Sequence, residues 1–142
     1  MKIQQLSLFA ENKPGHIAAP ARLLAQEGID IRSFYLADTQ QYGIVRMIVS
    51  DWKKAAATLE AHGIVVKATE VLAVEVPDRP GGMADVLGAL DGSGINIEYM
   101  YAFPFLRSGK AILIFRFADP DAAIAHLQKA GINVLAGDEL LK

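Results

Sequence analysis

Two short segments of the sequence carry residue types that could hold a small anionic ligand. Asn12-Lys13-Pro14-Gly15-His16 returns later in the chain in similar form as Asp78-Arg79-Pro80-Gly81-Gly82. Each segment ends an alternating apolar stretch and opens an amphipathic one, which predicts a strand that turns into a helix. Free amides and the dipole at a helix start favour carboxylates and phosphates, and an Asn or Asp can orient such a ligand. Pro-Gly after Asn or Asp is also common in ordinary turns, and a single copy of the segment would be interpreted as a simple turn.

The elements that must position these segments follow one order, and that order occurs twice. Alternating or apolar runs predict strands at 3–10, 29–36, 44–49 and 64–69, and helical spacing predicts helices that end near Gly28 and Gly63. Pro20 disturbs the beginning of the first helix. The same signals return in the second half of the chain, displaced by the spacing between Asn12 and Asp78. Two extra residues near the third strand of the second unit lengthen this spacing for the elements that follow. We expect two domains, 1–70 and 71–142, with no linker between them.

Strand, helix, strand, strand, helix, strand is the order of a ferredoxin-like unit. The sequence therefore predicts an α+β protein of two tandem βαββαβ domains, each an antiparallel sheet with helices on one face. Six of the eleven aromatic residues lie between Tyr99 and Phe117, which is more than one helix-covered face would use. We expect a partner, either the sister domain or a second chain, to cover part of this set: Tyr99, Tyr101, Phe103, Phe105, Phe115 and Phe117.

Composition excludes several classes of function. The 142 residues are 52% hydrophobic and 21% charged, which favours a folded core. The formal net charge of −2 provides no basic surface for nucleic acid or an anionic membrane, and the absence of cysteine excludes disulfides and thiolate metal sites. No apolar segment approaches the about 18 to 20 residues of a membrane span, and Leu6–Ala10 is too short for a signal-peptide core. We expect a cytoplasmic protein.

No constellation of residues indicates catalysis, a cofactor or a metal site. The histidines His16, His62 and His126 share no metal-ligand spacing, and the carboxylates are scattered over caps, helix faces and turns. His62 and His126 are interpreted as structural or surface residues, whereas His16 lies in the candidate ligand loop. We predict that the protein is not an enzyme.

Asn12-x-Pro-Gly followed by Gly-Ile-Asp-Ile, and Asp78-x-Pro-Gly followed by Gly-Ile-Asn-Ile, make the chain similar to tandem ACT domain proteins over nearly its whole length. The resemblance implies regulatory modules that bind amino acids at domain interfaces. It places ligand contacts in the loop after the first strand and at the start of the second strand, the latter often supplied by a neighbouring domain. Carried over by position, the ligand-binding residues are Asn12, Pro14, Gly15, His16 and Asp30 in the first domain and Asp78, Pro80, Gly81, Gly82 and Asn96 in the second.

The two implied sites differ in charge. If the domains pair side by side, Asn12 faces Asn96, which suits a zwitterion whose carboxylate lies on helix amides. Asp78 then faces Asp30, and two carboxylates repel an anionic ligand. We therefore expect the Asn12 and Asn96 site to be the stronger one, within one chain or across a dimer.

The predicted function is a stand-alone regulatory protein that binds a small amino acid or related metabolite between ACT domains and signals in trans. Its expected partners are that ligand, a second copy in a homodimer and an unidentified regulated protein. One alternative is a ligand-free subunit that acts through its aromatic sheet face. Another is RNA binding, since RNA-recognition domains share this order of elements, but Lys110 and Ile112 replace the aromatics needed for base stacking.

Overall fold

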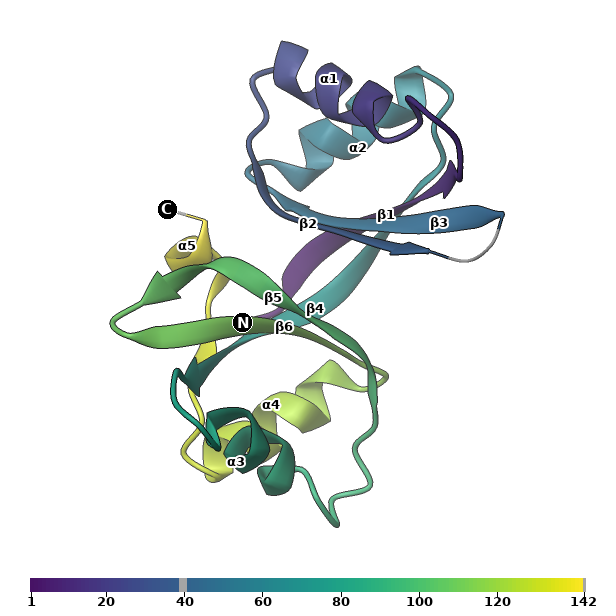
Figure 1. The fold of residues 1–142 in the computed structure, drawn as a ribbon. Helices are drawn as coiled ribbons and strands as arrows, with labels where there is room; N and C mark the ends of the chain where they lie inside the picture. The colour runs from purple at the N-terminus through teal and green to yellow at the C-terminus, as the bar shows by residue number, and fades with distance from the viewer. Residues whose placement is uncertain (39–40, 142) are drawn as a thin grey trace. The chain divides into compact units, whose positions relative to one another are not determined.

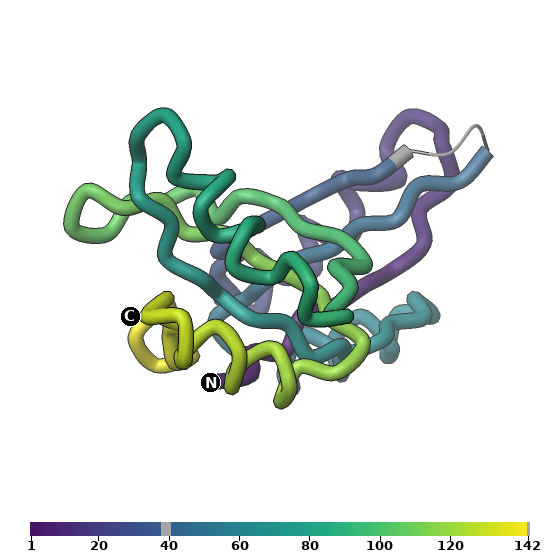
Figure 2. The backbone as a smooth tube through the Cα atoms, turned by 90° about the horizontal axis from the view of Figure 1, so that it is seen from below, coloured from purple at the N-terminus to yellow at the C-terminus, as the bar shows by residue number. Residues whose placement is uncertain are grey.

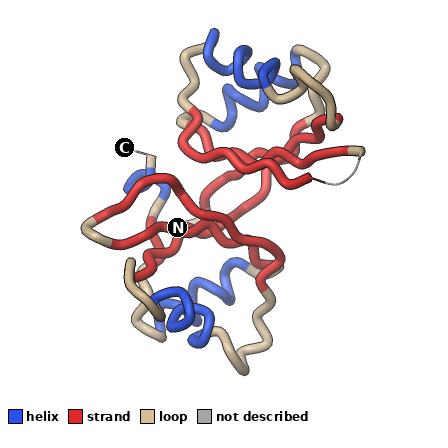
Figure 3. Tube along the Cα trace, in the orientation of Figure 1, coloured by secondary structure: helices blue, strands red, loops and turns tan. Residues whose placement is uncertain are grey.

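The computed structural model describes residues 1–38 and 41–141, without the side chain of Asp38, and divides into two compact units. The N-terminal unit is Gln4–Thr69, and the C-terminal unit combines Met1–Ile3 with Glu70–Lys142. In each unit the two longer helices lie on one face of the strands (Figures 1 and 3). The predicted fold, α+β with two ferredoxin-like units, is confirmed. The extent of each ACT domain, 1–70 and 71–142, stays a prediction.

The elements of the N-terminal unit follow the predicted order. They are β1 (Ile3–Glu11), α1 (Ala18–Gln26), β2 (Ile31–Asp38), β3 (Tyr42–Val49), α2 (Trp52–Ala61) and the beginning of β4 (Val66–Pro77). Strand β3 is antiparallel to both β1 and β2, with Val45 opposite Leu8 and Leu36. Inward side chains alternate along β1 and β3, as expected for strands with one buried face. They meet Leu24 of α1 and Ala55 and Leu59 of α2 in one core.

The C-terminal unit repeats this arrangement. It contains the rest of β4, then α3 (Gly82–Ala89), β5 (Ile97–Arg107), β6 (Lys110–Phe117), α4 (Pro120–Lys129), β7 (Val134–Leu135) and the single turn α5 (Gly137–Leu140). Strand β6 pairs antiparallel with both β4 and β5. On its other edge β4 pairs with β7 at only two positions, Ala73 with Leu135 and Val74 with Val134. The core under α3 and α4 holds alternate residues of β4 and β6.

The N-terminal residues attach to this second unit. Lys2 lies 3.2 Å from a carboxylate oxygen of Asp121 and 3.3 Å from one of Glu70. Hydrogen bonds to these two carboxylates raise the pKa of Lys2 above its usual value, and the bond to Asp121 has the largest effect. Ile3 is only 3% exposed. The N-terminus accordingly lies beside α4 in Figure 2.

The aromatic residues of β5 and β6 divide between the two faces of the C-terminal sheet. Phe115 and Phe117 belong to the core under the helices, with stacked rings 5.7 Å apart. Tyr101 and Phe103 stand opposite Ile114 and Ile112, which alternate with those core residues and so occupy the other face. Of the six aromatics, only these two phenylalanines therefore fill the unit's own core, and a partner for the rest stays a prediction.

Aspartates begin the second helix of each unit. The Asp51 side chain accepts a hydrogen bond from the Lys54 amide, and that of Asp119 accepts one from the Ala122 amide, both at 3.1 Å. Each bond satisfies one of the donors that a helix start leaves unpaired. The two caps occur at equivalent places in the repeat.

Candidate functional site

The two Pro-Gly loops have the same backbone hydrogen bonds at equivalent positions of the repeat. In the first loop the amides of Lys13, His16 and Ala19 donate to the carbonyls of Glu11, Lys13 and Gly15. In the second, the amides of Arg79, Gly82 and Asp85 donate to those of Pro77, Arg79 and Gly81. Gly15 and Gly81 adopt φ values of +86° and +87°, a left-handed conformation that favours glycine. The repeat in sequence is thus a repeat in local structure.

His16 and Gly82 are equivalent positions of the two loops, but the room for a side chain differs between them. A side chain at Gly82 would collide with the carbonyl oxygen of Pro77, so only glycine fits there. With a side chain at His16 the first loop is looser: the amide-to-carbonyl distance to Lys13 is 3.4 Å, against 3.0 Å in the second loop. Helix α1 begins at Ala18, two residues later than α3 does in the repeat.

This late start agrees with the disturbance expected from Pro20. Residues 14–17 form turns, and Pro20 lies in the first turn of α1, where a proline costs no helical hydrogen bond. The amide of Ala19, donating to Gly15, begins the helical ladder. The amides of Lys13 and His16 donate within the loop, and the other amides at a helix start are available to an acceptor from outside.

The first loop borders an open hollow of about 690 Å³ in the N-terminal unit. Four of its lining residues belong to the loop, one immediately precedes α1 and two lie in α1, namely Asn12, Lys13, Pro14 and Gly15, then Ile17, then Ala18 and Ala21. The predicted residues Asn12, Pro14 and Gly15 therefore share one surface, whereas His16 is not among the lining residues. Ile17, Ala18 and Ala21 were not predicted as site residues, although their helical spacing from Pro14 places them on one face.

The second loop is more strongly charged. Arg79 Nη2 lies 2.7 Å from a carboxylate oxygen of Asp85, in the first turn of α3, and Arg79 Nη1 donates to the carbonyl of Pro80 at 3.1 Å. Asp78 and Gly81 are exposed, and Gly82 is buried. The first turn of α1 contains no acidic residue. An anion at the start of α3 therefore meets carboxylates that an anion at the start of α1 does not.

Asp30 and Asn96 lie away from the loops of their own units. Each precedes its second strand, β2 or β5, and pairing places that end of the strand beside Val49 or Phe117, the last residues of β3 and β6. The loops follow the opposite ends of the sheets, where Glu11 pairs with Tyr42 and Pro77 with Lys110. A loop and the polar residue of the same unit therefore cannot hold one small ligand.

The remaining histidines make structural contacts. A ring nitrogen of His62 lies 2.9 Å from the carbonyl oxygen of Thr58, one turn earlier in α2. A ring nitrogen of His126 lies 2.8 Å from that of Ala89 and joins α4 to α3. Within the part of the chain that the structure describes, no cluster of three side chains could hold a metal ion. In residues 1–38 and 41–141, no helix is long and apolar enough to cross a membrane.

Comparison with known proteins gives one family match and several structural matches. The family model described as an ACT domain pair matches residues 1–142. A crystal structure of a protein from Bacteroides thetaiotaomicron is 36% identical, with a TM-score of 0.92 over 100% of this chain and 97% of that one. A search of curated proteins found no match.

Two more distant structures share the fold. The ligand-free regulatory subunit of aspartate kinase from Thermus thermophilus is 20% identical, with a TM-score of 0.62 over 89% of this chain and 91% of that one. Aspartate kinase from Synechocystis is 22% identical, with a TM-score of 0.62 over 94% of this chain and 26% of that one. The same pair of units thus occurs as most of one solved chain and as a small part of another.

Proposed function

We propose that this chain, which belongs to the family of ACT domain pairs, is a regulatory protein that binds a small amino acid or related metabolite. The observation that carries the proposal is the hollow at the first Pro-Gly loop. It joins the amides at the start of α1 to the Asn12 side chain and to an apolar wall. Amides suit a ligand carboxylate, and the wall suits its carbon skeleton.

The first loop is the stronger of the two sites in this proposal. At the start of α3, Asp78 and Asp85 add negative charge, and the Arg79 that offsets it is already paired with Asp85. At the start of α1 the equivalent positions are Asn12 and Ala19, which are uncharged. A carboxylate at the first loop therefore meets the amides of a helix start with less repulsion than at the second loop.

A polar residue from a neighbouring ACT domain completes each proposed site. Asn96 serves the first loop and Asp30 the second, because neither loop can reach the equivalent residue of its own unit. Asp30 is engaged locally, with a carboxylate oxygen 3.2 Å from Arg32. This engagement leaves the second site poorer in free polar groups than the first.

Regulation in this proposal acts in trans, through a homodimer and a separate regulated protein. The ligand can transmit a signal only if it binds one conformational or assembly state more tightly than another. The Thermus thermophilus structure that shares the fold is named as a regulatory subunit, which gives a precedent for such a role.

A second candidate function is a ligand-free subunit that acts through the sheet face of the C-terminal unit. The observation in its favour is that Phe105 and Leu106, near the end of β5, are 51% and 65% exposed. Tyr101 and Phe103, earlier on the same strand, are buried. In this function the aromatic strand binds the regulated protein directly.

A thermal-unfolding screen against the twenty amino acids distinguishes the two functions. A ligand at 100 times its Kd stabilises the folded state by about 2.7 kcal/mol, enough to raise the Tm by about 5 °C or more. We expect one or a few amino acids to raise the Tm, Asn12→Ala to remove the effect, and Asp78→Ala to keep most of it. Asp91→Ala, an exposed carboxylate outside both loops, is the matched control. If no amino acid raises the Tm at millimolar concentration, the ligand-free subunit is favoured.

A further inference from the structure

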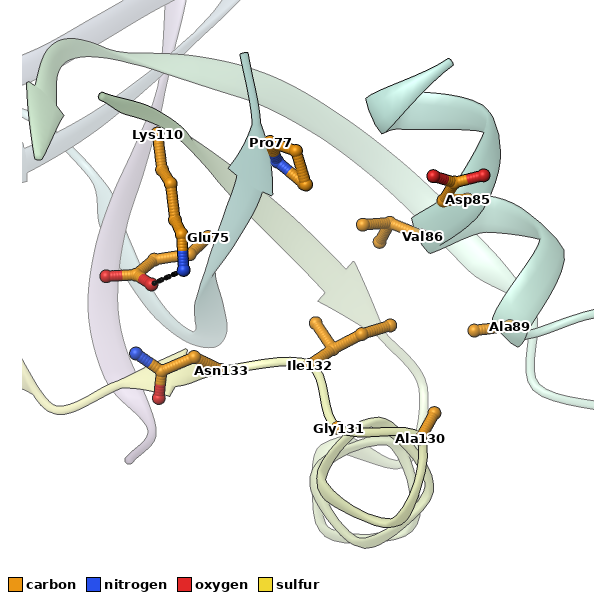
Figure 4. Close-up of a pocket in the computed structure, with 10 residues that line it drawn as sticks. All are labelled: Glu75, Pro77, Asp85, Val86, Ala89, Lys110, Ala130, Gly131, Ile132 and Asn133. Carbon is orange, nitrogen blue, oxygen red and sulfur yellow. Dashed lines mark hydrogen bonds and ion pairs between the residues drawn. The ribbon is translucent and has the colours of Figure 1, made fainter. Parts of the chain in front are cut away.

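The C-terminal unit contains a second concave site, which neither Pro-Gly loop explains. It is a pocket of about 260 Å³ at the edge of β4, between α3 and the segment that follows α4 (Figure 4). Strand β7 pairs with this edge of β4 at Ala73 and Val74, and the Glu75 amide donates one further hydrogen bond to the carbonyl of Asn133, which lines the pocket, at 3.1 Å. No described residue of Asp78–Gly82 lines it.

One wall of the pocket is apolar and the other carries an ion pair. Pro77, Val86, Ala89 and Ile132 form the apolar side, whereas Glu75 and Lys110 lie across from them (Figure 4). This combination of an apolar wall with a few polar groups is typical of small-molecule sites.

The two partners of the ion pair are unequally exposed. The Glu75 side chain is 11% exposed and that of Lys110 is 50% exposed, with 3.5 Å between Nζ and Oε2. This distance is long for a charge-assisted hydrogen bond, and an exposed lysine pair contributes little stability. The Lys110 ammonium can therefore move into water at low cost, whereas the Glu75 carboxylate stays in the pocket and needs a cation.

The backbone adds to the preference for positive charge. Ala130 and Gly131, immediately after the last residue of α4, line the pocket. The end of a helix carries a partial negative charge and favours cations. Asp85 is also at the rim, but Arg79 already neutralises it at 2.7 Å. The largely buried Glu75 carboxylate and the C-terminus of α4 therefore both favour a cation in the pocket.

We propose that this pocket binds a small primary amine with a short apolar tail. The ligand ammonium replaces Lys110 at the Glu75 carboxylate, and the tail packs on Val86, Ala89 and Ile132. The site needs no ligand carboxylate, so it is independent of the amino-acid site proposed at the first loop.

The test uses n-butylammonium as the probe, with n-butyrate and 1-butanol of the same chain length as comparisons. Amide resonances of Gly131 and Asn133 report on the pocket in titrations of the full chain followed by NMR, and those of Asn12 and Gly15 report on the first loop. We expect saturable shifts at the pocket from n-butylammonium, markedly weaker ones from 1-butanol, and none from n-butyrate.

Two substitutions with opposite expected effects decide the role of the ion pair. Glu75→Gln removes the charge without changing the shape and should weaken n-butylammonium binding about tenfold or more. Lys110→Met removes the competing ammonium and should tighten binding about threefold or more. Glu98→Gln, an exposed carboxylate on β5, is the matched control and should leave the Kd unchanged. Equal shifts from butyrate, no saturable shift, or an unchanged Kd in Glu75→Gln would overturn the proposal.

Discussion

At Gly82 the backbone of α3 begins so close to β4 that a side chain has no room. We expect Gly82→Ala to destabilise the protein by about 2 kcal/mol or more, because the helix start must move away from Pro77. Gly88 is the matched control, since it lies inside α3 without a left-handed φ, and a Cβ added there would meet nothing within 4 Å. There alanine should stabilise by about 0.5 to 1 kcal/mol. Urea denaturation measures both, and equal effects would contradict the explanation.

Substitution by alanine should cost more stability at a buried aromatic residue of the C-terminal unit than at an exposed one. Phe115 is 1% exposed and stacks on Phe117 in the core, so Phe115→Ala should cost about 3 to 5 kcal/mol. Phe105 is 51% exposed and touches Phe103 at a ring distance of 5.6 Å. Phe105→Ala should cost less than about 1 kcal/mol. Denaturant midpoints of the two variants provide the comparison, and a large loss at Phe105 would show that its exposed ring supports the fold.

Among the secondary-structure elements, α2 and α4 depend on single side-chain caps. Asp51→Ala and Asp119→Ala should each cost about 1 kcal/mol, because each leaves a helix amide without its acceptor. The loss should accelerate hydrogen exchange in the first turn of the helix concerned and not in the other helix. Asp91→Ala, which caps no helix start, serves as the control. Unchanged exchange rates at Lys54 and Ala122 would exclude the capping role.

The elements were largely predictable from the sequence because their signals are local. Alternation along β1, the helix ends near Gly28 and Gly63, and the repeat of the same order of elements needed no knowledge of distant residues. The beginning of α1 at Ala18 was only partly predictable, since Pro20 indicates a disturbed helix start without giving the residue at which the helix begins. The pocket beside Glu75 could not be predicted, because it results from packing between β4, α3 and the segment that follows α4.

For the whole molecule, the grouping of Met1–Ile3 with the C-terminal unit has an energetic consequence. Ile3 is 3% exposed and lies near Gly137. Ile3→Ala should therefore destabilise the protein by about 2 to 5 kcal/mol. Hydrogen exchange should accelerate in β7 and α5, far along the sequence from the substitution. Val65→Ala, at a position 78% exposed, should change stability by less than about 0.5 kcal/mol. An effect of Ile3→Ala confined to β1 would contradict this assignment.

The ion pair between Lys2 and Asp121 also affects the order in which the two units can fold during synthesis. These residues are 119 positions apart, so Lys2 leaves the ribosome several seconds before its partner at ordinary elongation rates of about 5 to 20 residues per second. Gln4–Thr69 can fold during that interval, since their contacts lie within the segment already made. The segment before them must wait, and closing so long a loop carries an entropic cost that short-range contacts avoid. The C-terminal unit therefore reaches its native state after the N-terminal unit.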